Sequence, residues 1–221
     1  FKDGFDCDWD GEIESINLLS LNIQFKNVSI LPSNQVDDWS VYSHKFYVSA
    51  SLIDFILHHR FTCHGYFNQS IIYEKQGVEK SHFAQVLSKM FASDLPSHIS
   101  FDYVTIKQSQ VVLQDASDDW QGTYSYDCQM SRERDGLHTQ LYLLDGNFVY
   151  KGVTIFENMF GNFVSVIPFD DDLQEIYSKV DCRLSIPSLH EKGACFLVGD
   201  LYRGRGAFVV SNEDQSFIIE P

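Results

Sequence analysis

The sequence predicts an α+β protein made of two related halves, each an antiparallel sheet with a packed helix. Three observations lead to this prediction. A Trp-x-Gly segment occurs twice, at residues 8–13 and 119–124. Sequence typical of β-strands follows each copy, and each half then reaches one candidate helix, at residues 52–59 and 173–180. An internal repeat of this kind would determine the architecture of the whole chain.

The strongest sign of duplication lies downstream of the two Trp-x-Gly segments. Residues 18–30 match residues 143–155, with Leu, Leu, Asn, Lys, Val and Ile in the same order and spacing. Strands select Val, Ile and aromatic residues in any case, so the shared Asn and Lys are the more informative matches. We therefore interpret the chain as an internal duplication, with one α+β repeat at residues 1–114 and the other at residues 115–221.

The tryptophans are expected to be buried and to cap the small core of each half, because they carry a large apolar area. The glycine two residues after each Trp, Gly11 and Gly122, permits a kink or bulge where a strand begins. A hairpin is predicted at residues 141–155, with its turn at the Asp-Gly-Asn sequence of residues 145–147.

Three helices are predicted from caps and periodicity. Ser51 followed by Asp54 has the pattern of a capping box and starts a helix at residues 52–59. Residues 77–94 place apolar side chains at i, i+3, i+4, i+7 and i+8, which indicates one buried face. Residues 173–180 follow three aspartates, which favour the positive end of a helix dipole.

The charge balance excludes one class of partner and favours another. The chain has 44% hydrophobic residues, enough for a packed core, and a net charge of −15 from 16 basic and 31 acidic residues. A nucleic-acid binder needs clustered Lys and Arg, so we expect no nucleic-acid partner. The acidic excess serves solubility or attracts a basic protein partner. The candidate binding residues are acidic side chains of the second half: Asp118, Asp119, Asp170, Asp171 and Asp172.

The cysteines predict the compartment. Five is an odd number, there is no C-x-x-C, and the spacings match no disulfide framework. We therefore expect mostly buried thiols in a reducing, cytoplasmic environment. No apolar run approaches the roughly 18 residues that span a bilayer, so no membrane association is expected.

No metal and no cofactor are expected, but two groups of residues could bind metal. Asp6, Asp8 and Asp10 precede Gly11 with the spacing of a calcium loop, although the bidentate glutamate of such a loop is missing. His58, His59, Cys63 and His64 include zinc-type ligands and a possible catalytic Cys–His pair. These groups support two alternative interpretations, a calcium-stabilised binding module and a hydrolase that uses the His/Cys cluster.

The sequence contains no P-loop, no dinucleotide fingerprint, no G-x-S-x-G and no H-E-x-x-H. Its two Trp-x-Gly segments with following strands resemble uncharacterised bacterial α+β domains associated with toxin-immunity loci. The resemblance covers about a third of the chain and implies no catalytic residues. We therefore expect a non-enzymatic, acidic protein-binding module, in its sharpest form an immunity-type protein that neutralises a partner.

Overall fold

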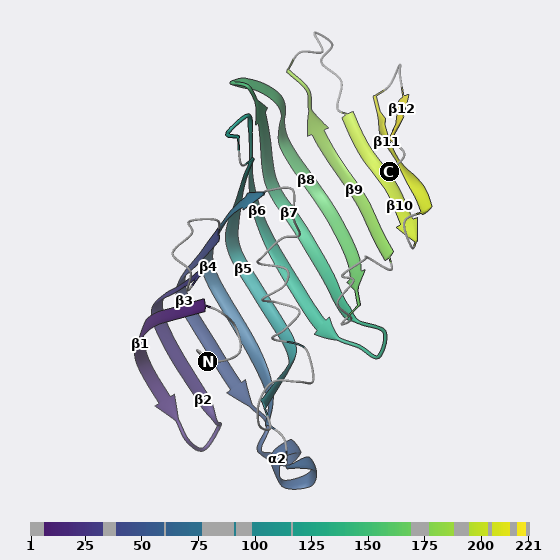
Figure 1. Ribbon diagram of the computed structural model, residues 1–221. Helices are drawn as coiled ribbons and strands as arrows, with labels where there is room; N and C mark the ends of the chain where they lie inside the picture. The colour runs from purple at the N-terminus through teal and green to yellow at the C-terminus, as the bar shows by residue number, and fades with distance from the viewer. Residues whose placement is uncertain are drawn as a thin grey trace.

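A computed structural model describes residues 7–32, 39–59, 61–76, 91, 99–115, 117–168, 177–187, 195–202, 205–212 and 216–219. Over these residues the chain forms a single twelve-stranded sheet, in which the spatial order of the strands follows the sequence from β1 to β12 (Figure 1). Neighbouring strands are antiparallel, except that β4 and β5 are parallel.

The strands are long, and one short helix lies between β3 and β4. The elements are β1 (Cys7–Asn17), β2 (Asn22–Pro32), β3 (Trp39–Ala50), α2 (Leu52–His58), β4 (Phe61–Gln76), β5 (Ile99–Asp115), β6 (Trp120–Arg132), β7 (Leu137–Tyr150), β8 (Val153–Ile167), β9 (Tyr177–Ser185), β10 (Cys195–Tyr202), β11 (Arg205–Ser211) and β12 (Ser216–Ile219).

The predicted α+β class, with a packed helix in each half, is wrong, because the described chain is almost entirely strand. The helix expected at residues 173–180 lies partly outside the described residues, and its last four residues belong to β9. In β9, buried Val180 and Leu184 alternate with exposed Lys179 and Arg183, which is the period of a strand and not of a helix. Of the helix expected at residues 77–94, the described residues include only Phe91, which is helical and fully buried.

The sheet is also not divided into two halves. The expected boundary at residues 114 and 115 falls at the end of β5, and β5 is hydrogen-bonded to β4 on one side and to β6 on the other. The matched segments occupy different elements: residues 18–30 hold the turn before β2 and most of β2, whereas residues 143–155 hold the end of β7 and the start of β8. The similarity therefore reflects shared strand composition.

The predicted hairpin turn at residues 145–147 is likewise wrong, since β7 continues to Tyr150 and the turn falls at Lys151 and Gly152. Gly146 stays in the strand because it faces Tyr124 across the β6–β7 ladder. A Cβ atom on Gly146 would lie 2.7 Å from Cδ1 of the Tyr124 ring, and one on Gly122 would lie 2.6 Å from its Cε2. The two glycines therefore make room for a tyrosine ring.

Trp9 and Trp120 are half-buried, not buried as expected. Trp9 lies on the edge strand β1 and packs on Phe25 and Phe46 of the next two strands, with ring centroids 5.5 and 5.4 Å away. Trp120 is the first residue of β6 and packs on Phe148 at 5.6 Å. An edge strand and a strand end each leave one side of the indole uncovered.

One hydrophobic core covers one face of the sheet, from β1 to β10. At its centre, Phe46 is 2% exposed and stacks on Phe67 with ring centroids 4.2 Å apart. All five cysteines are free and buried, which confirms the expectation of buried thiols. Burial raises the pKa of the Cys128 thiol to about 12 and also raises that of Cys63, so both thiols are protonated at neutral pH.

A kink crosses β2 to β5 at one height. Asn27 in β2, Gln69 in β4 and Gln108 in β5 have left-handed φ angles of 50°, 54° and 50°. Because each kink adds one residue, the buried positions change phase. In β4, for example, Phe67 is buried before the kink and Ser70 after it. The kinks let strands of 11 to 17 residues keep one face in the core while the sheet bends.

Beside the kink lies a row of three buried serines. The Ser70 hydroxyl donates to Ser43 Oγ at 2.8 Å, and the Ser70 backbone N–H donates to Ser109 Oγ at 3.0 Å. The two outer hydroxyls donate to backbone carbonyls. The Ser43 hydroxyl donates to the Lys45 carbonyl and the Ser109 hydroxyl donates to the Lys107 carbonyl, each at 2.9 Å. The row satisfies polar groups that the kink would otherwise leave unpaired in the core.

Candidate binding surfaces

Six large apolar side chains are exposed at one end of the sheet, and we call them the apolar end surface. They are Leu18, Leu19, Leu52, Ile53, Ile56 and Leu57, with exposed fractions from 50% to 96%. The first two lie in the turn between β1 and β2, and the other four lie on α2. The Ala50 N–H donates to the Leu21 carbonyl at 3.0 Å, which ties the turn to the chain entering α2. Figure 1 shows the β1–β2 turn and α2 at the lower end of the sheet.

The sequence predicted α2 and its cap correctly, and the cap explains why so short a helix forms. Ser51 Oγ accepts a hydrogen bond from the Asp54 N–H at 3.2 Å, and His59 closes the helix in the left-handed conformation. The Ser51 N–H donates to the Thr62 carbonyl at 3.0 Å. Phe55 stacks on Phe61 of β4 with ring centroids 4.3 Å apart. A seven-residue helix is not stable alone, so these contacts hold its apolar side chains in place.

The amount of exposed apolar surface on α2 is unusual. A surface helix normally buries one apolar stripe and turns polar residues outward, but α2 reads Leu-Ile-Asp-Phe-Ile-Leu-His and has only Asp54 and His58 as polar residues. Single exposed leucines are common. Contiguous exposed apolar side chains instead mark interaction sites. The apolar end surface is therefore the strongest candidate for an interaction site among the described residues.

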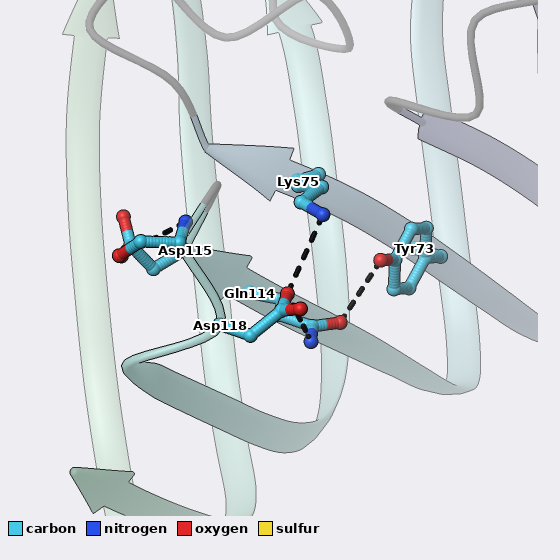
Figure 2. Close-up of polar contacts among 6 residues, drawn as sticks. Tyr73, Lys75, Gln114, Asp115 and Asp118 are labelled. Carbon is cyan, nitrogen blue, oxygen red and sulfur yellow. Dashed lines mark hydrogen bonds and ion pairs between the residues drawn. The ribbon is translucent and has the colours of Figure 1, made fainter. Parts of the chain in front are cut away.

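The acidic residues predicted to bind a partner are engaged within the chain where they are described. Asp118 Oδ1 accepts from Gln114 Nε2 at 2.9 Å and lies 3.4 Å from Lys75 Nζ, as Figure 2 shows. Gln114 also accepts a hydrogen bond from the Tyr73 hydroxyl at 2.9 Å. This network joins the turn after β5 to β4 and β5, so Asp118 has a structural role in addition to any contribution to binding.

Asp119 is similarly placed. Its carbonyl accepts from the Lys151 N–H at 2.6 Å, and its carboxylate lies 3.9 Å from Lys151 Nζ. Lysines therefore offset the charges of both described aspartates, although exposed pairs of this kind contribute little to stability. Asp170, Asp171 and Asp172 lie outside the described residues.

The structure does not bring the zinc-type ligands together. Cys63 is buried in the core, whereas His64 is exposed, because consecutive residues of β4 point to opposite faces. His59 is exposed at the end of α2. Among the described residues, no three His, Cys, Asp or Glu side chains are grouped as a metal site requires. The protonated, buried Cys63 thiol is not placed to act as a nucleophile.

The calcium-type segment is a strand and not a loop. Asp6 lies outside the described residues, while Asp8 and Asp10 lie on β1, which is paired with β2 along its length. A calcium loop needs a sharp turn at its glycine, but Gly11 is extended. A Cβ atom on Gly11 would meet the Val28 side chain at 3.2 Å. The glycine therefore allows close packing of β1 on the core.

A second surface lies on the sheet face opposite to the core, and we call it the tyrosine groove. It has a volume of about 470 Å³ and is lined by side chains from β2, β3, β4 and β5. Tyr47, Tyr66 and Tyr103 line it together with His64, Asn22 and Asn68. Two hydroxyl side chains and the backbone of a glycine complete the lining.

The strand register positions the groove residues. Tyr66 of β4 lies opposite Tyr47 of β3, and His64 of β4 lies opposite Tyr103 of β5. They alternate with core residues such as Phe67, which turns them to the outer face. The groove adjoins the apolar end surface, since its lining residue Asn22 follows the turn that holds Leu18 and Leu19.

Sequence reasoning found neither surface. The apolar end surface had a detectable signal, because five of the seven residues of α2 are apolar and a helix cannot bury every face against one sheet. The tyrosine groove had none, since Tyr47, Tyr66 and Tyr103 come from three strands whose register local sequence does not determine.

Comparison of the chain with protein-family models gives no match, and comparison with curated proteins gives none. In the part of the chain that the structure describes, no helix combines the length and the apolar character of a membrane-spanning segment.

Proposed function

We propose that this chain is a non-enzymatic protein-binding module that docks a protein partner on the apolar end surface. The observation that supports this proposal is the exposure of Leu18 and Leu19 at the same end of the sheet as the exposed apolar side chains of α2. The Ser51 cap holds the helix, and the Ala50–Leu21 hydrogen bond holds the turn. Burying each of the six side chains contributes roughly 1–2 kcal/mol. An immunity-type role, in which binding neutralises a partner, is the sharpest form of this proposal.

The net charge of −15 favours a partner whose docking surface is apolar and rimmed by Lys or Arg. Complementary charge raises the association rate and is screened by salt over a Debye length of about 10 Å at 0.1 M. The apolar contacts should then determine the dissociation rate, because interface substitutions act mainly on dissociation.

The experiment compares two matched variants, Ile53→Asp on α2 and Ile218→Asp on β12. The two isoleucines have nearly equal exposed fractions, 69% and 68%, so both variants add one charge at an equally open position. Proteins that copurify with the wild-type chain are quantified by mass spectrometry, and the affinity of each enriched protein is measured by calorimetry. Ile53→Asp should weaken the binding of a true partner at least about tenfold, which corresponds to 1.4 kcal/mol, and Ile218→Asp should not.

Two further measurements separate the alternatives. If light scattering shows a dimer that Ile53→Asp dissociates, the partner is a second copy of this chain. If Ile53→Asp abolishes cosedimentation with phosphatidylcholine vesicles, the surface contacts lipid and the proposal of a protein partner fails. Recovery of the same proteins by wild type and Ile53→Asp, with equal affinities, also refutes it.

A further inference from the structure

We propose that the tyrosine groove is a second binding site, and that it takes a neutral, hydroxyl-rich ligand, a short oligosaccharide. The groove is separate from the apolar end surface and does not depend on the protein partner proposed above. Its volume of about 470 Å³ lies within the range of sites for small ligands. Its composition and its place in the sheet identify the ligand class.

The lining contains no carboxylate, ammonium or guanidinium group, although 21% of the chain is charged. Two lysines flank the lining residue Asn68, Lys45 on β3 and Lys107 on β5. Lys107 lies 2.9 Å from the Asp127 carboxylate, which neutralises it. Within the lining itself, a charged ligand would lose hydration without gaining an opposite charge. The amides of Asn22 and Asn68 both donate and accept hydrogen bonds, which matches the two roles of a sugar hydroxyl.

The aromatic rings supply the apolar part of the site. Tyr47 and Tyr66 form an edge-to-face pair with ring centroids 5.6 Å apart and an interplanar angle of 65°. His64 and Tyr103 form another, at 6.3 Å and 75°. Aromatic faces carry negative potential and attract the polarised C–H groups on the face of a sugar ring. The two pairs, side by side on three strands, suit a ligand of alternating C–H and hydroxyl groups.

The position of the groove argues against two other ligands. A peptide that binds by strand addition needs an unpaired sheet edge, but β3, β4 and β5 are each paired on both sides. A nucleic acid needs cations that neutralise its phosphates, and the lining has none. The groove therefore contacts a ligand mainly through side chains, which is sufficient for a carbohydrate.

The test titrates the full chain with four neutral tetrasaccharides, those of the malto, cello, chito and manno series, by calorimetry. At least one should bind with a dissociation constant in the micromolar to millimolar range. Tyr66→Ala should weaken it about tenfold or more. Tyr142→Ala is the matched control, because Tyr142 on β7 has the same 37% exposed fraction as Tyr66 and lies outside the groove; it should leave binding unchanged.

Tyr66→Phe keeps the ring and removes the hydroxyl, so it tests the site even if Tyr66→Ala fails to fold. It should weaken binding by about two- to tenfold, the value of one hydrogen bond. Three results would overturn the proposal: no heat of binding with any of the four sugars, equal affinity in wild type and both Tyr66 variants, or tighter binding of heparin tetrasaccharide than of every neutral one. The Ile53→Asp variant should bind the sugar normally, which separates this site from the apolar end surface.

Discussion

Replacing Ser109 by alanine should destabilise the fold more than replacing Ser70, although both side chains are buried and each loses one hydroxyl. The Ser109 hydroxyl accepts from the Ser70 N–H at 3.0 Å and donates to the Lys107 carbonyl at 2.9 Å. Its loss leaves a buried backbone N–H without this acceptor, at a cost of about 1–3 kcal/mol. The Ser70 hydroxyl donates to Ser43 Oγ, so Ser70→Ala removes one bond between side chains and should cost about 1 kcal/mol or less.

Urea unfolding followed by tryptophan fluorescence measures both free energies of unfolding, and equal m-values would show that the two variants unfold from comparable states. For a chain of this size, each kcal/mol shifts the melting temperature by about 2–4 °C. At a cost of about 2 kcal/mol, the middle of the range given above, Ser109→Ala should melt about 4–8 °C below wild type. Ser70→Ala should melt no more than about 4 °C below it. Equal shifts, or a larger shift for Ser70→Ala, would refute the role assigned to the serine row.

Three further predictions concern the core and its ionisable groups. Phe46→Ala should lower the free energy of unfolding by about 3–5 kcal/mol. Phe160 is 48% exposed, so Phe160→Ala should change this free energy by less than about 0.5 kcal/mol. Urea titration of both variants checks the two values. Because the pKa of Cys128 rises from 9.0 to about 12 on folding, the unfolded thiol ionises first as pH increases, and the thiol should cost about 1.4 kcal/mol of stability at pH 10 relative to pH 8. Cys128→Ala should reduce the measured loss between these pH values by that amount, and an unchanged loss would contradict the burial argument. Burial opposes ionisation of Asp127, but hydrogen bonds from Lys107 and the Gln108 N–H outweigh it and hold the pKa of its carboxyl below 3.8. The ionised carboxylate therefore stabilises the fold above pH 3.8, and this stabilisation is lost as the pH falls through the lowered pKa. Asp127→Asn should show a shallower decline in the free energy of unfolding between pH 5 and pH 2.5.

Local signals in the sequence predicted local structure well. The Ser51–Asp54 cap identified α2 to within one residue of its end, because cap and helix lie within one short segment. The absence of a disulfide pattern correctly predicted buried thiols. The three aspartates at residues 170–172 favour a helix start, and they outweigh the competing signal in the prediction for residues 173–180. That signal is the alternation of Val180 and Leu184 with charged residues, which is the period of the strand that forms.

Features that depend on contacts between distant strands were not predictable from one sequence. Gly146 resembles a turn residue, and only the ring of Tyr124 on the neighbouring strand shows why it stays extended. The repeat interpretation failed for a related reason. Residues 143–155 span the turn between β7 and β8, whereas residues 18–30 begin in the turn before β2 and continue along β2. The candidate binding surfaces are likewise built from segments that only the fold brings together.

The outer strand β1 limits how far the sheet can grow. In the described part of the chain it pairs only with β2, and an unpaired strand edge is a template for further strands. Asp8, Asp10, Glu12 and Glu14 are all exposed along it at every second position. A second copy approaching edge to edge would bring its own carboxylates to within about 5 Å of these, the spacing of paired strands. The acidic side chains of β1 thus oppose its pairing with the β1 strand of another copy, although Glu12 also has Lys26 of β2 at 3.0 Å.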